Sequence, residues 1–433
     1  MAKNLLICFD GTWNTAQSEG EHEDNEATNV WRLFKLAQGD VYEEGKGSSA
    51  NYAASQIKWY DEGVGTAWYE RLRGGLFGHG LDENILQGYM ALAELYEEGD
   101  KIFLCGFSRG AYTARSLGGL IYRCGLVDRH KLEEMGESLQ KNSLTDLGKA
   151  CEKALTLYHD YDNEEDEKEK ESTHAVASFR KLYSRTVPIE CIAVWDTVKA
   201  LGLPSAVVDW LPFGLGERYN AARYGFHDDT LSPIVRHGYH ALAIDEHRAD
   251  FASVLWDDNN NECTHVVQNE CTYVMQNECN QVITIDNLSV SDTPLNDKKP
   301  KTSQIIEQRW FCGAHSDVGG GYESRALSDQ SLIWMCHKLD ECGLSLQDAI
   351  WAREVHSSAF PCSHVPYSPL CFAPITDSFR DFYTITHPWQ SRHLRAMHAD
   401  NSTVTLDPTV LERIIYDASY RPQNEGLADL LEL

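Results

Sequence analysis

The pentapeptide Gly106-Phe107-Ser108-Arg109-Gly110 has the residue types and spacing of a nucleophilic serine site. A serine that attacks an ester must stand at a sharp turn between a strand and a helix, with its hydroxyl exposed and small residues on either side. The pentapeptide alone is common. Here an apolar run leads into it from Lys101, and a helical pattern of small residues leaves it. We therefore predict that Ser108 is a nucleophile.

A nucleophilic serine needs a histidine as general base and a carboxylate that orients the imidazole, in the chain order serine, acid, histidine. Asp196 ends an apolar run downstream of Ser108, and His315 begins a glycine-rich segment after another such run. We predict that these two residues complete a triad. The alternatives are His240 or His247 as the base and Asp245 as the acid, in a stretch that is interpreted as core with a buried ion pair.

The tetrahedral intermediate of ester hydrolysis needs amide donors for its oxyanion. The residue after the nucleophile normally supplies one donor, and a loop at a neighbouring strand end supplies the second. The first donor is therefore predicted to be the amide of Arg109. Gly11 and Thr12, which follow the first apolar run of the chain, are the candidates for the second.

Three short apolar runs, at residues 5–9, 101–107 and 189–195, have the composition of strands that are buried on both faces. Helical patterns follow at 82–98, 109–123 and 329–342, each ending close to a glycine. Alternation of such strands with helices predicts an α/β fold of the α/β-hydrolase type, in which helices flank a mostly parallel sheet.

The 433 residues are predicted to form a single α/β-hydrolase domain with helical and loop insertions, because no linker rich in proline and serine divides the chain. The predicted insertions are a helical, acidic one at 128–184, a lid candidate at 201–225 and a surface hairpin at 257–303. Residues 346–433 are predicted to be a C-terminal extension that packs on the core.

The chain carries 38 Lys and Arg against 66 Asp and Glu, a formal net charge of −28. Such a charge repels polyanions, so nucleic acid is not an expected partner. No apolar stretch reaches the length needed to span a bilayer, and no secretory signal begins the chain. The 13 cysteines are irregularly spaced and often apolar in context, which favours a reducing compartment.

Two metal hypotheses arise from the residues. An eight-residue repeat, residues 261–268 and 269–276, carries cysteines, but structural zinc ligands are paired two to four residues apart, so a zinc site is not predicted there. The second hypothesis is a metal-dependent hydrolase that uses Asp10, Asp196, Asp317 and His315. Besides a serine hydrolase and a metal-dependent hydrolase, a non-catalytic binding module on the same fold is the third possible class of function. The serine mechanism itself needs no metal or organic cofactor.

Several segments together resemble the bacterial and fungal family that is defined by the domain DUF2235, namely residues 4–14, 61–66, 99–115, 194–198, 240–248 and 313–322. In this resemblance the family's GFSRGA element corresponds to residues 106–111. Its strand-end aspartate corresponds to Asp196, and the histidine of its HSDVGGGY element corresponds to His315.

The resemblance implies an α/β-hydrolase related to the Tle1 lipase effectors of type VI secretion, some of which are phospholipases. It therefore implies hydrolysis of carboxylic esters, with an ester or a lipid as substrate. A secretion or immunity protein is the partner implied for an effector. The chain is then expected in the cytoplasm, or outside the cell after secretion without a signal peptide.

Overall fold

The computed structural model describes the chain over residues 2–11, 27–63, 79–137, 146–161, 166–198, 230–257, 304–347, 369–379, 389–394, 397–399 and 402–431. These residues build a nine-stranded sheet in the order β10-β11-β9-β8-β7-β4-β1-β3-β2. All neighbouring strands are parallel except the edge pair β10 and β11. The prediction of a mostly parallel sheet flanked by helices is confirmed.

The strands of this sheet are β1 (Asn4–Phe9), β2 (Asp40–Val41), β3 (Gln56–Asp61), β4 (Lys101–Phe107), β7 (Ile189–Trp195), β8 (Val235–Ala243), β9 (Ile305–Phe311), β10 (Met397–Ala399) and β11 (Ser402–Leu406). A separate antiparallel pair consists of β5 (Leu126–Val127) and β6 (Ser184–Arg185). The three runs predicted as buried strands correspond to β1, β4 and β7. Every residue of β7 is buried, as expected for a central strand that is covered on both faces.

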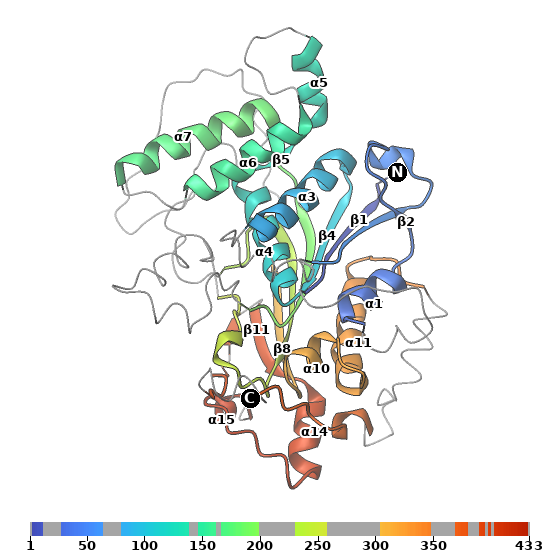
Figure 1. Ribbon diagram of the computed structural model, residues 1–433, viewed down its shortest axis with the longest axis vertical. Helices are drawn as coiled ribbons and strands as arrows, with labels where there is room; N and C mark the ends of the chain where they lie inside the picture. Colours follow the sequence, from blue (N-terminus) through green and yellow to red (C-terminus); the bar gives the residue numbers. More distant parts are fainter. Residues whose placement is uncertain are drawn as a thin grey trace.

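The helices are α1 (Asn29–Leu36), α3 (His79–Leu95), α4 (Arg109–Cys124), α5 (Arg129–Glu137), α6 (Leu147–Tyr161), α7 (Asp166–Tyr183), α10 (His315–Gly319), α11 (Ala326–Glu341), α14 (Pro408–Tyr416) and α15 (Leu427–Leu431). Short 3₁₀ turns lie at Ser49–Asn51, Ala249–Phe251 and Pro369–Phe372. In Figure 1, α3, α4, α6 and α7 lie on one side of the sheet, whereas α1 and α11 lie on the other.

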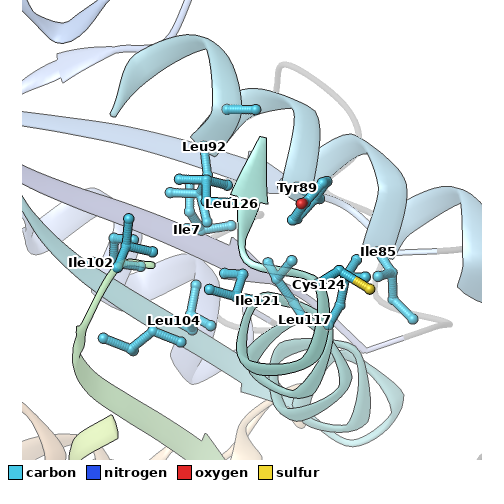
Figure 2. Packing of buried hydrophobic residues seen from close by; sticks show 14 of the residues in the cluster. Ile7, Ile85, Tyr89, Leu92, Ile102, Leu104, Leu117, Ile121, Cys124 and Leu126 are labelled. Atoms are coloured by element: carbon cyan, nitrogen blue, oxygen red, sulfur yellow. The ribbon is translucent and has the colours of Figure 1, made fainter. Parts of the chain in front are cut away.

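Alternate side chains of each central strand supply the two faces of the sheet. In β1, Leu5, Ile7 and Phe9 join the cluster under α3 and α4, and Leu6 and Cys8 join the cluster under α1 and α11. Figure 2 shows the first cluster, in which residues of β1 and β4 meet the apolar faces of α3 and α4. Burial of each large aliphatic side chain of this kind stabilises the fold by about 1.5–3 kcal/mol.

Helix boundaries differ from the sequence predictions by about one turn at most. Helix α4 begins at Arg109 and ends at the Gly125 cap, whose φ is 72°. Helix α3 begins at His79 and α11 begins at Ala326, each three residues before the predicted start at 82 or 329. Patterns of apolar residues identify a helix better than its ends, because the end turns are decided by capping contacts.

The predicted insertion at 128–184 contains helices α5, α6 and α7. The lid candidate at 201–225, and the hairpin at 257–303 except for its first residue, lie outside the described residues. Within the C-terminal extension, β11 lies parallel to β9 and α14 packs against β9. This extension therefore continues the sheet.

Among the described residues, no helix is long and apolar enough to cross a membrane. The nine cysteines in that part of the chain are Cys8, Cys105, Cys124, Cys151, Cys191, Cys312, Cys336, Cys342 and Cys371. All of them are buried as free thiols.

Candidate active site

Ser108 occupies the sharp turn between β4 and α4, at the carboxyl edge of the sheet. Its backbone angles, φ 58° and ψ −120°, are strained for a residue with a side chain. A Cβ on Gly106 would lie 2.3 Å from the carbonyl oxygen of Gly110, and a Cβ on Gly110 would lie 2.1 Å from that of Phe9. Glycine is therefore required on both sides of the serine, as in a nucleophile elbow.

The candidate oxyanion donors lie on two neighbouring strand ends. Arg109 is the first residue of α4, and amides in the first turn of a helix point out of its N-terminal end. Gly11 follows β1, which pairs with β4. Its amide donates to Oδ1 of Asp10 at 2.6 Å, so Gly11 can serve an oxyanion only after exchanging this bond. Thr12 lies outside the described residues.

Asp196 directly follows β7, the strand that pairs with β4 and so lies next to the serine turn. The amide of Ser108 donates to the carbonyl of Trp195 at 3.1 Å, which ties the two strand ends together. Asp196 has a φ of 38°, and it and Ser108 are the two non-glycine residues with positive φ in the described part of the chain. Its carboxylate is fully buried and accepts the amide of Ala243 at 3.0 Å.

His315 is the first residue of α10, after the end of β9. Its Nδ1 lies 2.5 Å from Oδ2 of Asp196, so a proton on Nδ1 is donated to the carboxylate and the lone pair is left on Nε2. The imidazole packs against the ring of Phe107, with centroids 4.6 Å apart, and against that of Phe251 at 5.0 Å. Because Phe107 directly precedes Ser108, the histidine lies beside the turn that carries the serine.

The electrostatic surroundings keep Asp196 ionised. Burial by itself raises the pKa of this carboxyl, but the charge of Arg392 and the hydrogen bond and charge of His315 lower it by more. The resulting pKa lies well below the usual range for aspartate. A carboxylate that stays charged can stabilise an imidazolium that forms beside it.

The rival base and acid have other contacts. His240 is fully buried, and its Nε2 accepts the amide of Thr197 at 3.0 Å. Burial and the nearby Arg115 lower the pKa of His240 to about 3, so the ring is neutral. Asp245 accepts the amide of Gly313 at 2.7 Å. These contacts support the backbone after Asp196 and before His315, which is a structural role.

The four residues of the metal hypothesis do not form one cluster. Asp196 contacts His315, whereas Asp10 accepts hydrogen bonds from Thr28 and Tyr60, and Asp317 accepts the amide of Ala314. Within the described ranges, no group of three or more His, Cys, Asp or Glu side chains has an arrangement that suits a metal ion.

The structure adds residues that sequence patterns did not indicate. Arg392 lies in the C-terminal extension, within residues 389–394. It donates to both carboxylate oxygens of Asp196, at 2.5 and 2.9 Å. Glu246 accepts the amide of His315 at 3.2 Å and forms the expected buried ion pair with Arg248 at 2.8 Å. Arg392 is nearly 200 residues from its partner and belongs to no recognisable motif, so no local signal marks it.

A family model matches residues 3–338 of the chain. The matching model is described as T6SS, phospholipase effector Tle1-like, catalytic domain. This range includes Ser108, Asp196 and His315, and it ends before Arg392.

One curated protein is similar to part of the chain. An uncharacterized protein of Saccharomyces cerevisiae is 28% identical over 274 residues, which are 59% of this chain and 33% of that protein. The chain thus spans about a third of the length of this curated relative.

Two solved structures are also similar. An uncharacterized protein from Pseudomonas aeruginosa has a TM-score of 0.42 at 18% identity, with 81% of this chain and 47% of that chain covered. The Tle1 effector bound to the VgrG spike of the type VI secretion system has a TM-score of 0.31 at 16% identity, with 74% and 51% covered.

Proposed function

The chain belongs to the family of Tle1-like phospholipase effector catalytic domains of type VI secretion, and from this premise we propose that it cleaves carboxylic esters of lipids with Ser108 as nucleophile. Membership of the family makes the chain a hydrolase of the lipase type. The serine mechanism, the residues that carry it and the lipid substrate are the proposal.

One observation carries this proposal, namely the 2.5 Å contact between His315 Nδ1 and Asp196 Oδ2 beside the strained turn at Ser108. The contact leaves Nε2 of His315 as the atom that accepts a proton. Since β4 and β7 are adjacent parallel strands, Ser108 and Asp196 leave the same edge of the sheet. A serine at a strained turn, an imidazole with a defined tautomer and an ionised carboxylate are the parts that acyl transfer needs.

In the proposed mechanism, Nε2 of His315 takes the Ser108 proton while Oγ attacks the ester carbonyl. The Arg109 amide and a second donor stabilise the tetrahedral oxyanion, an effect of about 3 kcal/mol for each donor. The intermediate then collapses. The C–O bond to the alcohol breaks, His315 protonates the departing alcohol, and the acyl group stays on Ser108. His315 then deprotonates a water that attacks the acyl carbon. The bond from this carbon to Oγ breaks, His315 returns the proton to Ser108, and the fatty acid is released.

The family also suggests a delivery partner. The related Tle1 effector has been seen bound to the VgrG spike, and a secretion component of that kind is the partner we propose for this chain. We further propose that the whole chain forms a single domain, which is supported by the presence of β11 from the C-terminal extension in the same sheet as β1.

The decisive test compares wild type with Ser108→Ala, using release of fatty acid and lysolipid from phospholipid vesicles and labelling by a fluorophosphonate. Alanine keeps a Cβ at the strained turn, so the variant should fold and lose at least 10³-fold in kcat. Ser116→Ala, a buried serine on the same helix α4, is the matched control and should keep wild-type turnover. Undiminished labelling of Ser108→Ala would contradict the proposal.

A further inference from the structure

Four buried carboxylates surround the loop that carries His315. They are Asp196 after β7, Asp245 and Glu246 after β8, and Asp317 in α10. Three of them accept consecutive backbone amides of this loop, which are Gly313 on Asp245 at 2.7 Å, Ala314 on Asp317 at 3.0 Å and His315 on Glu246 at 3.2 Å. The fourth, Asp196, accepts a hydrogen bond from the imidazole of His315. The backbone and the ring of the histidine are thus both held by carboxylates.

Each of these carboxylates also accepts a hydrogen bond from the described residues of the C-terminal extension, 369–379, 389–394, 397–399 and 402–431, which we call the C-terminal clamp. The four pairs are Arg392 on Asp196, Tyr420 on Asp245 at 3.1 Å, Ser378 on Glu246 at 2.9 Å and Thr376 on Asp317 at 2.8 Å. The clamp thus makes one contact with each of the four carboxylates that surround the histidine loop. The arrangement suggests that the clamp sets the position of the loop.

Arg392 makes the strongest of these contacts. Arg392 is 6% exposed, and its guanidinium forms a two-pronged bond with Asp196. Its Nη1 also donates to the carbonyl of Ala243, and its Nη2 donates to that of Phe251. A planar guanidinium on both oxygens fixes the plane of the carboxylate as well as its place. With that plane fixed, Oδ2 is held in line with Nδ1 of His315.

We propose that Arg392 is a positioning residue for hydrolysis: from the C-terminal clamp it fixes the orientation of Asp196 and so that of His315. This inference rests on the proposed function of Ser108, Asp196 and His315. Arg392 touches no reacting atom. It acts through the carboxylate, and the catalytic site is incomplete without the clamp.

Arg392 also keeps Asp196 ionised, because burial raises the pKa of this carboxyl and the charge of Arg392 is the main effect that lowers it. The charged groups around the histidine loop are Asp196 with Arg392, Glu246 with Arg248, Asp245 and Asp317. Removal of the arginine makes Asp196 easier to protonate, and a protonated Asp196 cannot stabilise an imidazolium. The acidic limb of the kcat/KM profile should then move to higher pH, whereas a merely structural loss would leave this limb in place.

The experiment measures kcat, KM and the pH profile of Arg392→Met and Arg392→Lys on the full chain, with a short p-nitrophenyl ester. For Arg392→Met we expect kcat to fall about 100-fold with little change in KM. We also expect the acidic limb to move up by about one pH unit. For Arg392→Lys, which keeps the charge but cannot form the two-pronged bond, we expect a loss of about 10-fold in kcat and no movement of the limb.

The matched control is Arg32→Met. Arg32 in α1 is also a buried arginine, 8% exposed, and it pairs with Asp329 of α11 at 2.6 Å, outside the clamp. It should lose thermal stability but keep the kcat and the acidic limb of wild type.

Wild-type kcat and an unmoved acidic limb in Arg392→Met would overturn the inference. If that variant does not fold, Arg392→Lys decides, because a kcat equal to wild type in Arg392→Lys would overturn it as well. Activity in Ser108→Ala would instead overturn the proposed function. The two failures are therefore distinguishable.

Discussion

Ser108 and His315 leave the same edge of the sheet, but the turns that carry them are held by different kinds of contact. The serine turn is held by backbone atoms, through the close approach of Gly106 to Gly110 and of Gly110 to Phe9. The histidine loop is held by buried carboxylates and by side chains of the distant C-terminal clamp.

This difference has a consequence for each turn. Backbone contacts at the serine tolerate no added atom and do not titrate. Carboxylate contacts at the histidine respond to protonation and to changes far away in the chain. The serine turn should thus be sensitive to steric change, and the histidine loop should be sensitive to charge.

The largest effect is expected for Asp196→Asn, which tests charge at the histidine. An amide cannot hold the imidazole tautomer or stabilise its charged form, so kcat should fall by about 10³–10⁴-fold. Steady-state kinetics on an ester substrate give the value. Asp100→Asn is the matched control. Asp100 is also a buried carboxylate, but it lies at the amino end of β4, whereas the site lies at the carboxyl ends of the strands. Similar losses of kcat in both variants would contradict a special role for Asp196.

A smaller but still large effect is expected for Gly110→Ala, which tests steric fit at the serine. The added methyl would lie 2.1 Å from the carbonyl oxygen of Phe9, so the free energy of unfolding should fall by about 3 kcal/mol. Urea unfolding measures this change.

Gly148→Ala is the control for helix propensity. Gly148 is also helical, and a Cβ there meets nothing closer than 3.4 Å, so this variant should gain up to about 1 kcal/mol. Equal stabilities of the two variants would mean that the serine turn relaxes to accept a side chain.

The smallest effect concerns pH. Burial raises the pKa of Asp245 to about 6, despite the hydrogen bonds from Gly313 and Tyr420 that lower it. Between about pH 4 and 6 the folded chain therefore holds a proton that the unfolded chain has released. Because the folded chain binds this proton more tightly than the unfolded chain, the free energy of unfolding rises as pH falls from 7 to 4.

Asp245→Asn removes this titration. The stability of wild type relative to Asp245→Asn should rise by about 2 kcal/mol between pH 7 and pH 4.5. Urea unfolding of both proteins at the two pH values measures the difference, and the comparison cancels the titration of all other groups. A difference that does not change with pH would show that Asp245 has an ordinary pKa in the folded chain.

The acidic residues of the site do not all respond in this direction. Burial raises the pKa of Glu246, but Arg248 lowers it by more, to about 2. That pair is stabilising above the ordinary pKa of glutamate, and its contribution is lost as pH falls toward 2. The histidine loop is thus expected to be most stable at mildly acidic pH.

Local residue types alone predicted the strands β1, β4 and β7, the turn at Ser108, and Asp196 and His315 as its partners. This was possible because each of these features depends on a few consecutive residues: an apolar run buries a strand, and flanking glycines allow a strained turn. The single-domain organisation stays a prediction, as do the roles of Ser108, Asp196, His315, Arg109, Gly11 and Thr12.

Only the tertiary structure decided how Asp196 and His315 are held. The contact between them joins β7 to α10 across 119 positions, and Arg392 reaches Asp196 across 196. Such contacts depend on which strand ends lie together and on how the C-terminal clamp folds back, and no periodicity in the residues encodes either. The tertiary structure also decided that His240 and Asp245 accept backbone amides, of Thr197 and Gly313, because burial leaves these polar side chains no other environment than the neighbouring loops.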